Sequence, residues 1–235
     1  MRALVIIPTY NEKNNIEHII SQVLDSDSRI EVLVVDDNSP DGTAEVVLKM
    51  QKENPKIHIL QRAGKLGLGT AYIDGFKKAL ELEFDAVFQM DADFSHDPKY
   101  LPVFLDELQN ADVIVGSRYI KGISVINWSL SRLLLSYFAN IYAKIVTGVP
   151  VNDLTGGFKC IKIEVLRSVD FSKFSSNGYA FQIELNYAFF SNGFRIKELP
   201  IIFVDREEGE SKMSNSIVLE AIYKIWTYRF KNYRL

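Results

Sequence analysis

The chain has 235 residues, of which 47% are hydrophobic and 24% are charged, and this composition is typical of a folded globular protein rather than a disordered one. The formal net charge of -3 at pH 7 argues against nucleic acid as a partner, because a phosphate backbone requires a basic surface. The single cysteine, Cys160, excludes a disulfide framework within the chain.

The first half of the chain alternates strand and helix patterns. Apolar runs typical of buried parallel strands are followed by apolar residues at helical spacing. The expected strands are Ala3–Ile7, Glu31–Val35, Ile57–Leu60, Ala86–Met90 and Val113–Gly116. The expected helices are one around Ile16–Leu24, one opened by Asp41–Thr43 with Ser39 or Asp41 as its cap, Thr70–Leu82 and Pro98–Leu108. This order predicts an α/β fold with an open, mostly parallel central sheet and helices on both faces.

The second half of the chain is less regular. Its expected elements are a helix at Ser129–Val146, a strand at Gly156–Ile161, a helix at Tyr179–Asn192, a strand at Ile196–Val204 broken by Pro200, and a terminal helix at Asn215–Phe230. No repeat or linker interrupts the pattern, so we expect a single domain over residues 1–235.

A glycine-rich loop at residues 64–72 invites a dinucleotide-binding interpretation. Gly67 and Gly69 match the first two glycines of that motif, but Tyr72 occupies the third position and the loop follows the third strand rather than the first. A Gly-Lys-Ser/Thr sequence is also absent. Hydride transfer and P-loop phosphoryl transfer are therefore unfavoured.

Acidic residues follow two of the expected strands, as Asp36-Asp37 and Asp91-Ala92-Asp93. Ligands of open α/β sheets bind beyond the carboxyl ends of the strands. Two aspartates spaced i, i+2 at such an exit can direct their carboxylates toward one point, and hard oxygen ligands suit Mg²⁺ or Mn²⁺. Such a cation offsets the charge on a departing nucleotide diphosphate. The alternative interpretation is a solvated acidic turn, and His96 nearby is expected to be structural.

Several segments resemble the family 2 glycosyltransferases, which have the GT-A (Rossmann-like) fold: Pro8–Glu12, Val34–Thr43, Met90–His96 and Gly116–Tyr119. Three more resemble the dolichol-phosphate and polyprenol-phosphate mannose synthases of that family: Asp153–Phe158, Gln182–Glu184 and Asp205–Lys212. The resemblance spans nearly the whole chain, in order. It implies a nucleotide-sugar-binding half at residues 1–120 and an acceptor half at residues 121–235.

The resemblance also implies a role for each matched position. The donor nucleotide sugar, GDP-mannose, would be held by Pro8, Tyr10, Glu12, Val35, Asp37, Asp91, Ala92, Asp93, Arg118, Arg206 and Lys212. The metal would be bound by Asp91 and Asp93, with Ser95 in the place of a third ligand. Asp91, Asp93, Arg206 and Lys212 would act in catalysis. The cations suit phosphate contacts.

The acceptor implied by the resemblance is a dolichyl or polyprenyl phosphate, bound by Arg118, Arg132 and Ser136. Arg132 and Ser136 lie one helical turn apart and so share a face. Their stretch is largely apolar, which suits a phosphate with a lipid tail. An arginine that extends from an amphipathic helix into solvent is the alternative.

Membrane contact is expected without a membrane span. Trp128–Val151 is interrupted by charged residues and falls short of the ~18–20 apolar residues that a span needs. We expect no signal peptide, because Met1–Pro8 runs directly into a strand-like segment. Aromatic and basic residues in Ile217–Arg234 suit an interfacial helix, although a helix packed on the core would show the same pattern. We therefore expect a cytoplasmic protein peripheral to the cytoplasmic face of a membrane, compatible with a separate membrane-anchoring subunit.

The predicted reaction is inverting mannosyl transfer, which gives a β-linked lipid-phosphate sugar. The acceptor phosphate is anionic and needs no general base, so catalysis would rest on positioning and charge stabilisation. Two alternatives remain open. One is a family 2 transferase with another donor, such as UDP-glucose, or a non-lipid acceptor; the other is a non-catalytic nucleotide-binding subunit.

Overall fold

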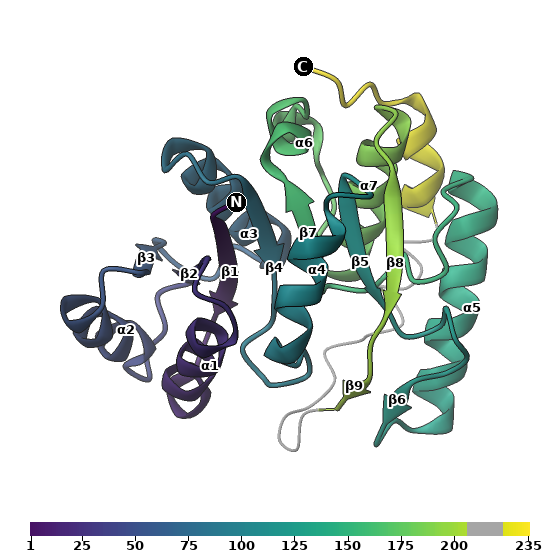
Figure 1. Cartoon of the computed structure of the whole chain (residues 1–235). Coiled ribbons are helices and arrows are strands. Elements are labelled where there is room, and N and C mark those ends of the chain that lie inside the picture. Colours follow the sequence, from purple (N-terminus) through teal and green to yellow (C-terminus); the bar gives the residue numbers. More distant parts are fainter. Residues whose placement is uncertain (206–222) are drawn as a thin grey trace.

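The computed structural model describes residues 1–205 and 223–235. These residues form a central sheet of seven strands in the order β3-β2-β1-β4-β7-β5-β8 (Figure 1). The strands are β1 (Ala3–Thr9), β2 (Ile30–Asp36), β3 (Ile57–Gln61), β4 (Ala86–Gln89), β5 (Val113–Ser117), β7 (Lys159–Lys162) and β8 (Ile196–Pro200). The five strands expected in the first half are all present, within about two residues of their expected ends.

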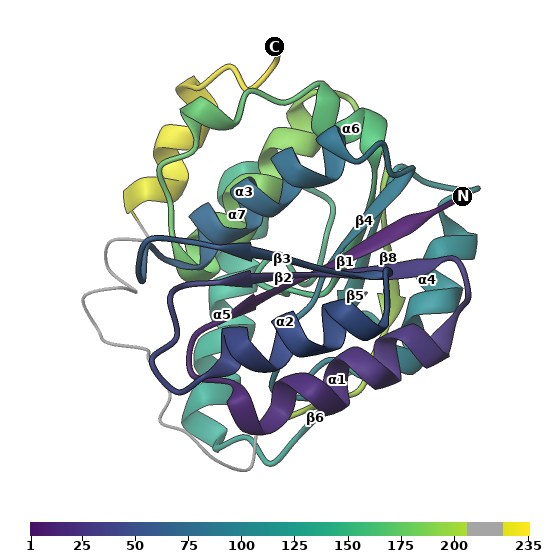
Figure 2. The same cartoon turned by 90° about the vertical axis from the view of Figure 1, so that its left-hand side faces the viewer.

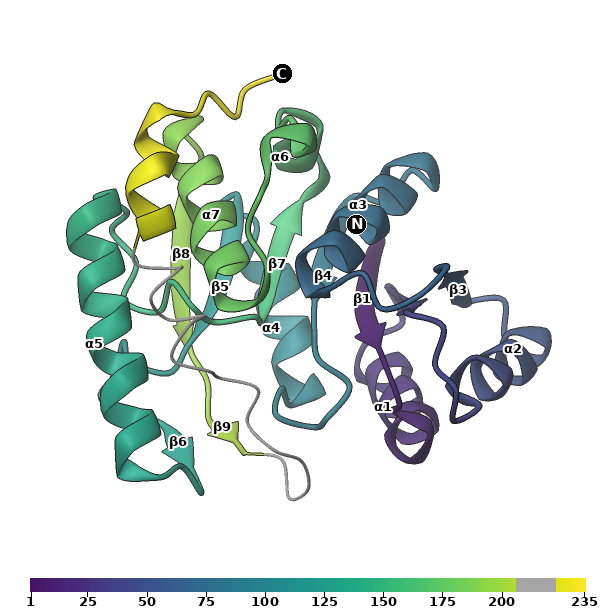
Figure 3. The ribbon, with the colours of Figure 1, turned by 180° about the vertical axis from the view of Figure 1, so that it is seen from behind.

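Helices cover both faces of the sheet, as the alternating pattern predicts (Figure 2). One face packs against α1 (Lys13–Ser26), α2 (Thr43–Glu53) and α4 (Leu101–Glu107). The other face packs against α3 (Leu68–Glu81), α6 (Ile163–Arg167) and α7 (Gly178–Ser191) (Figure 3). The apolar residues of each strand therefore alternate between two buried clusters, which explains why the strands read as continuous hydrophobic runs.

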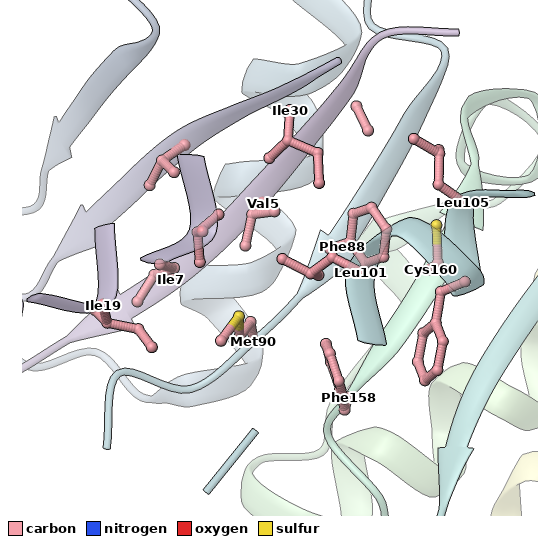
Figure 4. Packing of buried hydrophobic residues seen from close by; sticks show 14 of the residues in the cluster. Val5, Ile7, Ile19, Ile30, Phe88, Met90, Leu101, Leu105, Phe158 and Cys160 are labelled. Atoms are coloured by element: carbon pink, nitrogen blue, oxygen red, sulfur yellow. The ribbon is translucent and has the colours of Figure 1, made fainter. Parts of the chain in front are cut away.

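The core on the α1 side joins the strands to the helices through large aliphatic and aromatic side chains. Val5 and Phe88, from neighbouring strands, pack with Ile19 of α1 and Leu101 of α4 in one cluster, and Cys160 of β7 lies in it as well (Figure 4). Cys160 is fully buried, and burial raises the pKa of its thiol well above its usual value. Its role is that of a small hydrophobic residue.

One strand runs against the others. β7 pairs antiparallel with both β4 and β5, whereas β1 with β2, β1 with β4, β2 with β3 and β5 with β8 pair in parallel. The sheet is thus mostly parallel, as predicted. Because β7 is reversed, its first residue, Lys159, lies at the edge where the parallel strands end.

Proline shapes two of the expected elements. Pro98–Leu108, expected as one helix, begins as a 3-10 helix at Pro98–Tyr100 and becomes α4 only at Leu101. Pro102 lies in the first turn of α4 and has no N–H to donate, so it cannot make the bond that would continue one α-helix from residue 98. Pro200 ends β8, and the chain resumes as the short β9 (Phe203–Val204) beside β6 (Val125–Ile126).

The remaining helix, α5 (Leu130–Thr147), packs on α7 and on residues 225 and 228 through a third apolar cluster. Ser129 caps it, since its hydroxyl accepts from the Arg132 N–H. In the expected terminal helix, residues 215–222 lie outside the described part of the chain, residues 223–227 are helical and Tyr228–Phe230 is a 3-10 helix. Within the described ranges, no helix is long and apolar enough to cross a bilayer.

Candidate active site

Three of the predicted site residues follow strands at the edge of the sheet where the parallel strands end. The Met90 N–H donates to the Ile6 carbonyl at 3.2 Å, so the chain leaves β4 beside the last residues of β1. Tyr10 follows β1, Asp37 follows β2 and Asp91 follows β4. Their position agrees with the rule that ligands bind beyond the carboxyl ends of such strands.

Asp91 and Asp93 are each oriented by a neighbouring hydroxyl. The Tyr72 hydroxyl of α3 donates to Asp91 Oδ1 at 3.3 Å, and the Ser95 hydroxyl and N–H donate to Asp93 Oδ1 at 2.6 and 3.1 Å. Phe94, which lies between Asp93 and Ser95, has a φ of 61°. This value is uncommon for a bulky residue and turns the chain sharply after β4. Burial and the Asp91 carboxylate raise the pKa of Tyr72 well above its usual value, so its hydroxyl stays a donor.

His96 holds the backbone of Asp91 in place. Its Nδ1 accepts from the Asp91 N–H at 3.1 Å, and its ring stacks on Phe158 with centroids 4.9 Å apart. It is almost fully buried, and burial lowers its pKa, against the opposing effect of Asp91 and Asp93. The neutral ring thus holds the backbone at the end of β4, in agreement with the structural role expected for it.

The donor set fits a hard divalent cation. Asp91 and Asp93 both act on the pKa of Tyr72 and of His96, so both carboxylates lie near the same two rings. Outside residues 206–222, no group of three or more His, Cys, Asp or Glu residues forms a metal cage. Mg²⁺ and Mn²⁺ are commonly held by one or two carboxylates, with substrate phosphates and water completing the shell. Ser95 orients Asp93 in this arrangement, and its role as a ligand stays a prediction.

The two aspartates after β2 have different surroundings. Asp36 is fully buried and accepts from the Thr9 and Ser39 hydroxyls at 2.8 and 2.6 Å. Asp37 accepts from Arg62 at 2.6 Å and from the Leu66 N–H at 3.2 Å. Asp36 therefore fixes the end of the strand, while Asp37 holds the glycine-rich loop beside the predicted nucleotide site.

The glycine-rich loop has a packing role. A Cβ on Gly69 would come within 2.9 Å of both the Phe181 ring and the Ser176 carbonyl oxygen, so glycine allows the loop to lie against the start of α7. From the same loop, the Lys65 ammonium lies 4.1 Å from the centre of the Tyr10 ring. Tyr10 is partly exposed. Its ring therefore lies beside a cation in the position predicted for the nucleobase.

Four other predicted donor residues lie in or just after β1, β2 and β4. Val35 is fully buried in the core, so any contact with a nucleotide would come from its backbone. Ala92 is also buried, and Pro8 is half-buried at the end of β1. Glu12 precedes α1, and its carboxylate accepts from Asn15 at 3.0 Å. Their roles in donor binding stay predictions.

The two predicted acceptor arginines both lie close to the ring of Trp128. The Arg118 and Arg132 guanidinium carbons are 5.2 and 4.3 Å from the centre of its ring. Arg118 is buried and pairs with Asp153 through two bonds of 2.6 and 2.7 Å, whereas Arg132 pairs with Asp205 in a partly exposed position. The Ser136 hydroxyl accepts from the Tyr119 hydroxyl at 2.8 Å. The structure therefore places Arg132 and Ser136 together and assigns Arg118 to the Asp153 loop.

Two predicted catalytic residues, Arg206 and Lys212, lie outside the described residues. The structure also adds residues to which the sequence gave no role in the site: Lys159, and Gln182 from the matched segment Gln182–Glu184, are buried near Asp91. Lys159 donates to Gln182 Oε1 at 2.5 Å. A lysine inside the expected strand Gly156–Ile161, whose other residues carry no charge, was the available signal.

Comparison with known proteins shows the family of the chain. Residues 4–170 match the model of the family described as Glycosyl transferase family 2. An undecaprenyl-phosphate mannosyltransferase from Micrococcus luteus is 42% identical over 225 residues, which cover 96% of this chain and 93% of that protein. A polyprenol monophosphomannose synthase from Mycolicibacterium smegmatis is 43% identical over 226 residues, covering 95% of this chain and 85% of that protein.

Solved structures share the fold at lower identity. The crystal structure of glucosyl-3-phosphoglycerate synthase from Mycobacterium tuberculosis with Mn²⁺, uridine diphosphate and glucosyl-3-phosphoglycerate superposes with a TM-score of 0.67 at 17% identity, over 97% of this chain and 78% of that one. The same enzyme with phosphoglyceric acid gives a TM-score of 0.68 at 16% identity, with the same coverage. At this identity the likeness concerns the fold alone.

Proposed function

Because the chain belongs to glycosyl transferase family 2, we propose that it transfers mannose from GDP-mannose to a polyprenyl phosphate at the carboxyl edge of its sheet. The chain is a glycosyltransferase with the GT-A fold. The observation that supports the proposed reaction best is that Asp91 and Asp93 follow β4. Arg132 and Ser136 lie one turn apart on α5, in the half of the chain proposed to bind the acceptor.

The donor would lie across the ends of β1, β2 and β4. Tyr10 offers a ring for the base, and Asp37, held by Arg62, lies where a ribose would follow. Asp91 and Asp93 would hold a Mg²⁺ or Mn²⁺ ion, which neutralises charge on the diphosphate as it leaves. Tyr72 and Ser95 keep these carboxylates in place before the donor arrives, so little reorganisation is needed during the reaction.

The acceptor would lie along α5. A phosphate oxygen of the lipid attacks the anomeric carbon, and the bond from that carbon to the nucleotide diphosphate breaks. Arg132 would bind the phosphate by exchanging its partner Asp205, and Ser136 would add a hydroxyl contact. Attack from the face opposite the leaving group converts an α-linked donor into a β-linked lipid-phosphate mannose.

The lipid tail would continue along the outer face of α5. Leu134, Phe138, Ile141 and Ile145 form one stripe at helical spacing and are all exposed. Trp226 lies beside it and donates to the Tyr142 hydroxyl of α5 at 2.8 Å. We call this set of five side chains the α5 apolar face, and we propose that it rests on the surface of a membrane on the cytoplasmic side, with an anchoring subunit as a compatible partner.

A transfer assay tests the proposed reaction. Purified protein with Mn²⁺, detergent-solubilised polyprenyl phosphate and radiolabelled GDP-mannose is expected to give a labelled lipid. Parallel reactions with UDP-glucose and UDP-N-acetylglucosamine test the donor, and polyprenol without phosphate tests the acceptor. Labelled lipid formed from UDP-glucose but not from GDP-mannose would contradict the donor assignment, and equal labelling of polyprenol would contradict the acceptor assignment.

A further inference from the structure

Lys159 is a buried charged residue that the proposed mechanism does not use. It starts β7 between β4 and β5 and is fully buried. Its Nζ donates to the Gly156 carbonyl oxygen and, at 2.5 Å, to Gln182 Oε1. Burial lowers the pKa of its ammonium to about 7, although the charges of Asp153 and Asp91 oppose the shift. Such a residue is costly, so its position calls for a reason beyond packing.

The contact from Lys159 fixes the orientation of the Gln182 amide. Gln182 lies on α7 and is 2% exposed. Since Lys159 donates to Oε1, the amide Nε2 of Gln182 must point the other way. Among the described residues, Nε2 donates no hydrogen bond to the protein. It is therefore an oriented donor whose partner is not part of the described chain.

Gly157 marks where that donor points. A Cβ on Gly157 would lie 3.7 Å from Gln182 Nε2, 3.9 Å from Asp91 Oδ2 and 3.5 Å from His96 Cε1. These are ordinary contact distances, so the space left by the missing side chain adjoins both the metal-site carboxylate and the amide. An oxygen atom in that space would have both the Gln182 amide and the Asp91 carboxylate as neighbours.

We propose that Gln182 is a further substrate-binding residue, whose Nε2 donates a hydrogen bond to an oxygen of the sugar nucleotide beside Asp91, and that Lys159 is the residue that positions it. The oxygen belongs either to the diphosphate or to the transferred sugar. The inference rests on the proposed function for the class of substrate. It assigns a binding role to a residue of α7, an element to which the predicted site gave none.

Gln182→Glu separates the two roles of the side chain. The carboxylate still accepts from Lys159, but the donor toward Asp91 is replaced by an anionic oxygen. We expect the melting temperature to stay near that of the wild type, and the affinity for GDP-mannose with Mn²⁺, measured by titration calorimetry, to fall at least ~10-fold. An equal loss for GDP assigns the contact to the diphosphate, and a loss confined to GDP-mannose assigns it to the sugar. Wild-type affinity for both would overturn the inference.

Gly157→Ala provides a second variant that does not alter Lys159 or Gln182. Its backbone lies outside the left-handed region and its methyl group has room, so the fold is expected to be retained. The methyl group would fill the space between Asp91 and Gln182 and weaken GDP-mannose binding. Unchanged binding by this folded variant would show that no substrate atom enters that space.

Lys159→Met tests the positioning role. We expect it to raise the KM for the donor more than it lowers kcat, and to add little to the loss already caused by Gln182→Glu, because Lys159 acts through Gln182. Additive losses would indicate a general structural role and contradict the positioning. Lys162→Met is the matched control, since Lys162 ends the same strand and pairs with Asp112 at 3.0 Å, away from Asp91.

These measurements separate the inference from the proposed function, because donor binding needs no acceptor. A wild-type protein that binds GDP-mannose but labels no polyprenyl phosphate would contradict the proposed function, while the Gln182 variants could still be tested by donor binding. If the wild type binds UDP-glucose instead, the same variants are titrated with UDP-glucose and UDP. A wild type that binds none of these donors contradicts both proposals.

Discussion

At the scale of single residues, two arginines near the predicted acceptor are paired within the protein but differ in exposure. The side chains of Arg118 and Asp153 are 5% and 0% exposed, whereas those of Arg132 and Asp205 are 23% and 20% exposed. Breaking a buried pair leaves an uncompensated charge and costs about 3–5 kcal/mol, while a partly exposed pair is worth less. We therefore expect Arg132, rather than Arg118, to exchange its carboxylate partner for the proposed lipid phosphate.

Arg132→Ala is expected to raise the KM for polyprenyl phosphate roughly 10-fold or more, because it removes a charge-assisted hydrogen bond to the phosphate. The affinity for GDP-mannose should stay as in the wild type, and Arg132→Lys should restore part of the loss. Initial rates over a range of acceptor concentrations provide the measurement. An unchanged acceptor KM in the folded alanine variant would remove Arg132 from the acceptor site.

The buried Lys159 ammonium predicts a dependence of stability on pH. Its pKa is about 7 in the folded chain and 10.5 as its ordinary value. Between these values the unfolded chain binds a proton that the folded chain does not, so this group makes the free energy of unfolding rise as pH rises. The gain in the free energy of unfolding is complete only above the pKa of the lysine in the unfolded chain, and it is absent below about pH 7.

Urea unfolding of the wild type and of Lys159→Met between pH 7 and 9, without ligands, checks this. The stability of the wild type relative to the variant is expected to rise by on the order of 1 kcal/mol per pH unit. Because Cys160 and Tyr72 are common to both proteins, their own titrations cancel in the difference. A difference that stays constant with pH would mean that the buried ammonium keeps its ordinary pKa.

At the scale of elements, α5 is unusual in burying few of its apolar side chains. Of its buried residues, Asn140 and Thr147 are polar, and Asn140 bonds the Thr155 backbone N–H at 3.0 Å. Hydrogen bonds therefore help to attach the inner face of the helix to the segment that carries Thr155. On the outer face, Phe138 and Ile145 are 60% and 76% exposed. This inversion of the usual pattern marks the α5 apolar face as a contact surface.

Phe138→Glu with Ile145→Glu is expected to abolish flotation of the protein with vesicles that contain anionic lipid. Both side chains are exposed, so the melting temperature should change little, whereas each charge opposes insertion between lipids. Val103→Glu, at an exposed position of α4, controls for added charge. A wild type that does not float, or that instead forms a dimer lost in the double variant, would contradict the membrane assignment.

At the scale of the whole molecule, the sequence predicts the parts that depend on local pattern. The apolar runs at Ala3–Ile7 and Glu31–Val35 predicted β1 and β2, and Asp91 and Asp93 follow β4 as expected. The reversed direction of β7 could not be predicted, because four residues carry no signal for parallel or antiparallel pairing. The pairs Asp37–Arg62 and Arg118–Asp153 were also missed, since a long-range contact leaves no periodicity.

The described part of the molecule thus carries two aspartates after β4, an oriented amide on α7 and an exposed apolar face on α5. Asp91 and Asp93 have the central place, because the proposed departure of the nucleotide diphosphate depends on the cation that they would hold. Without it, the leaving group would develop its charge beside two carboxylates.

Titration of GDP into the wild type and into Asp91→Asn/Asp93→Asn, with and without Mn²⁺, tests this claim most directly. The account predicts that Mn²⁺ tightens GDP binding at least ~10-fold in the wild type, equivalent to about 1.4 kcal/mol, and has no such effect in the double variant. Amides keep the shape of the side chains but remove the charge, so the fold should be retained. A folded double variant whose GDP affinity still rises with Mn²⁺ as in the wild type would contradict the account.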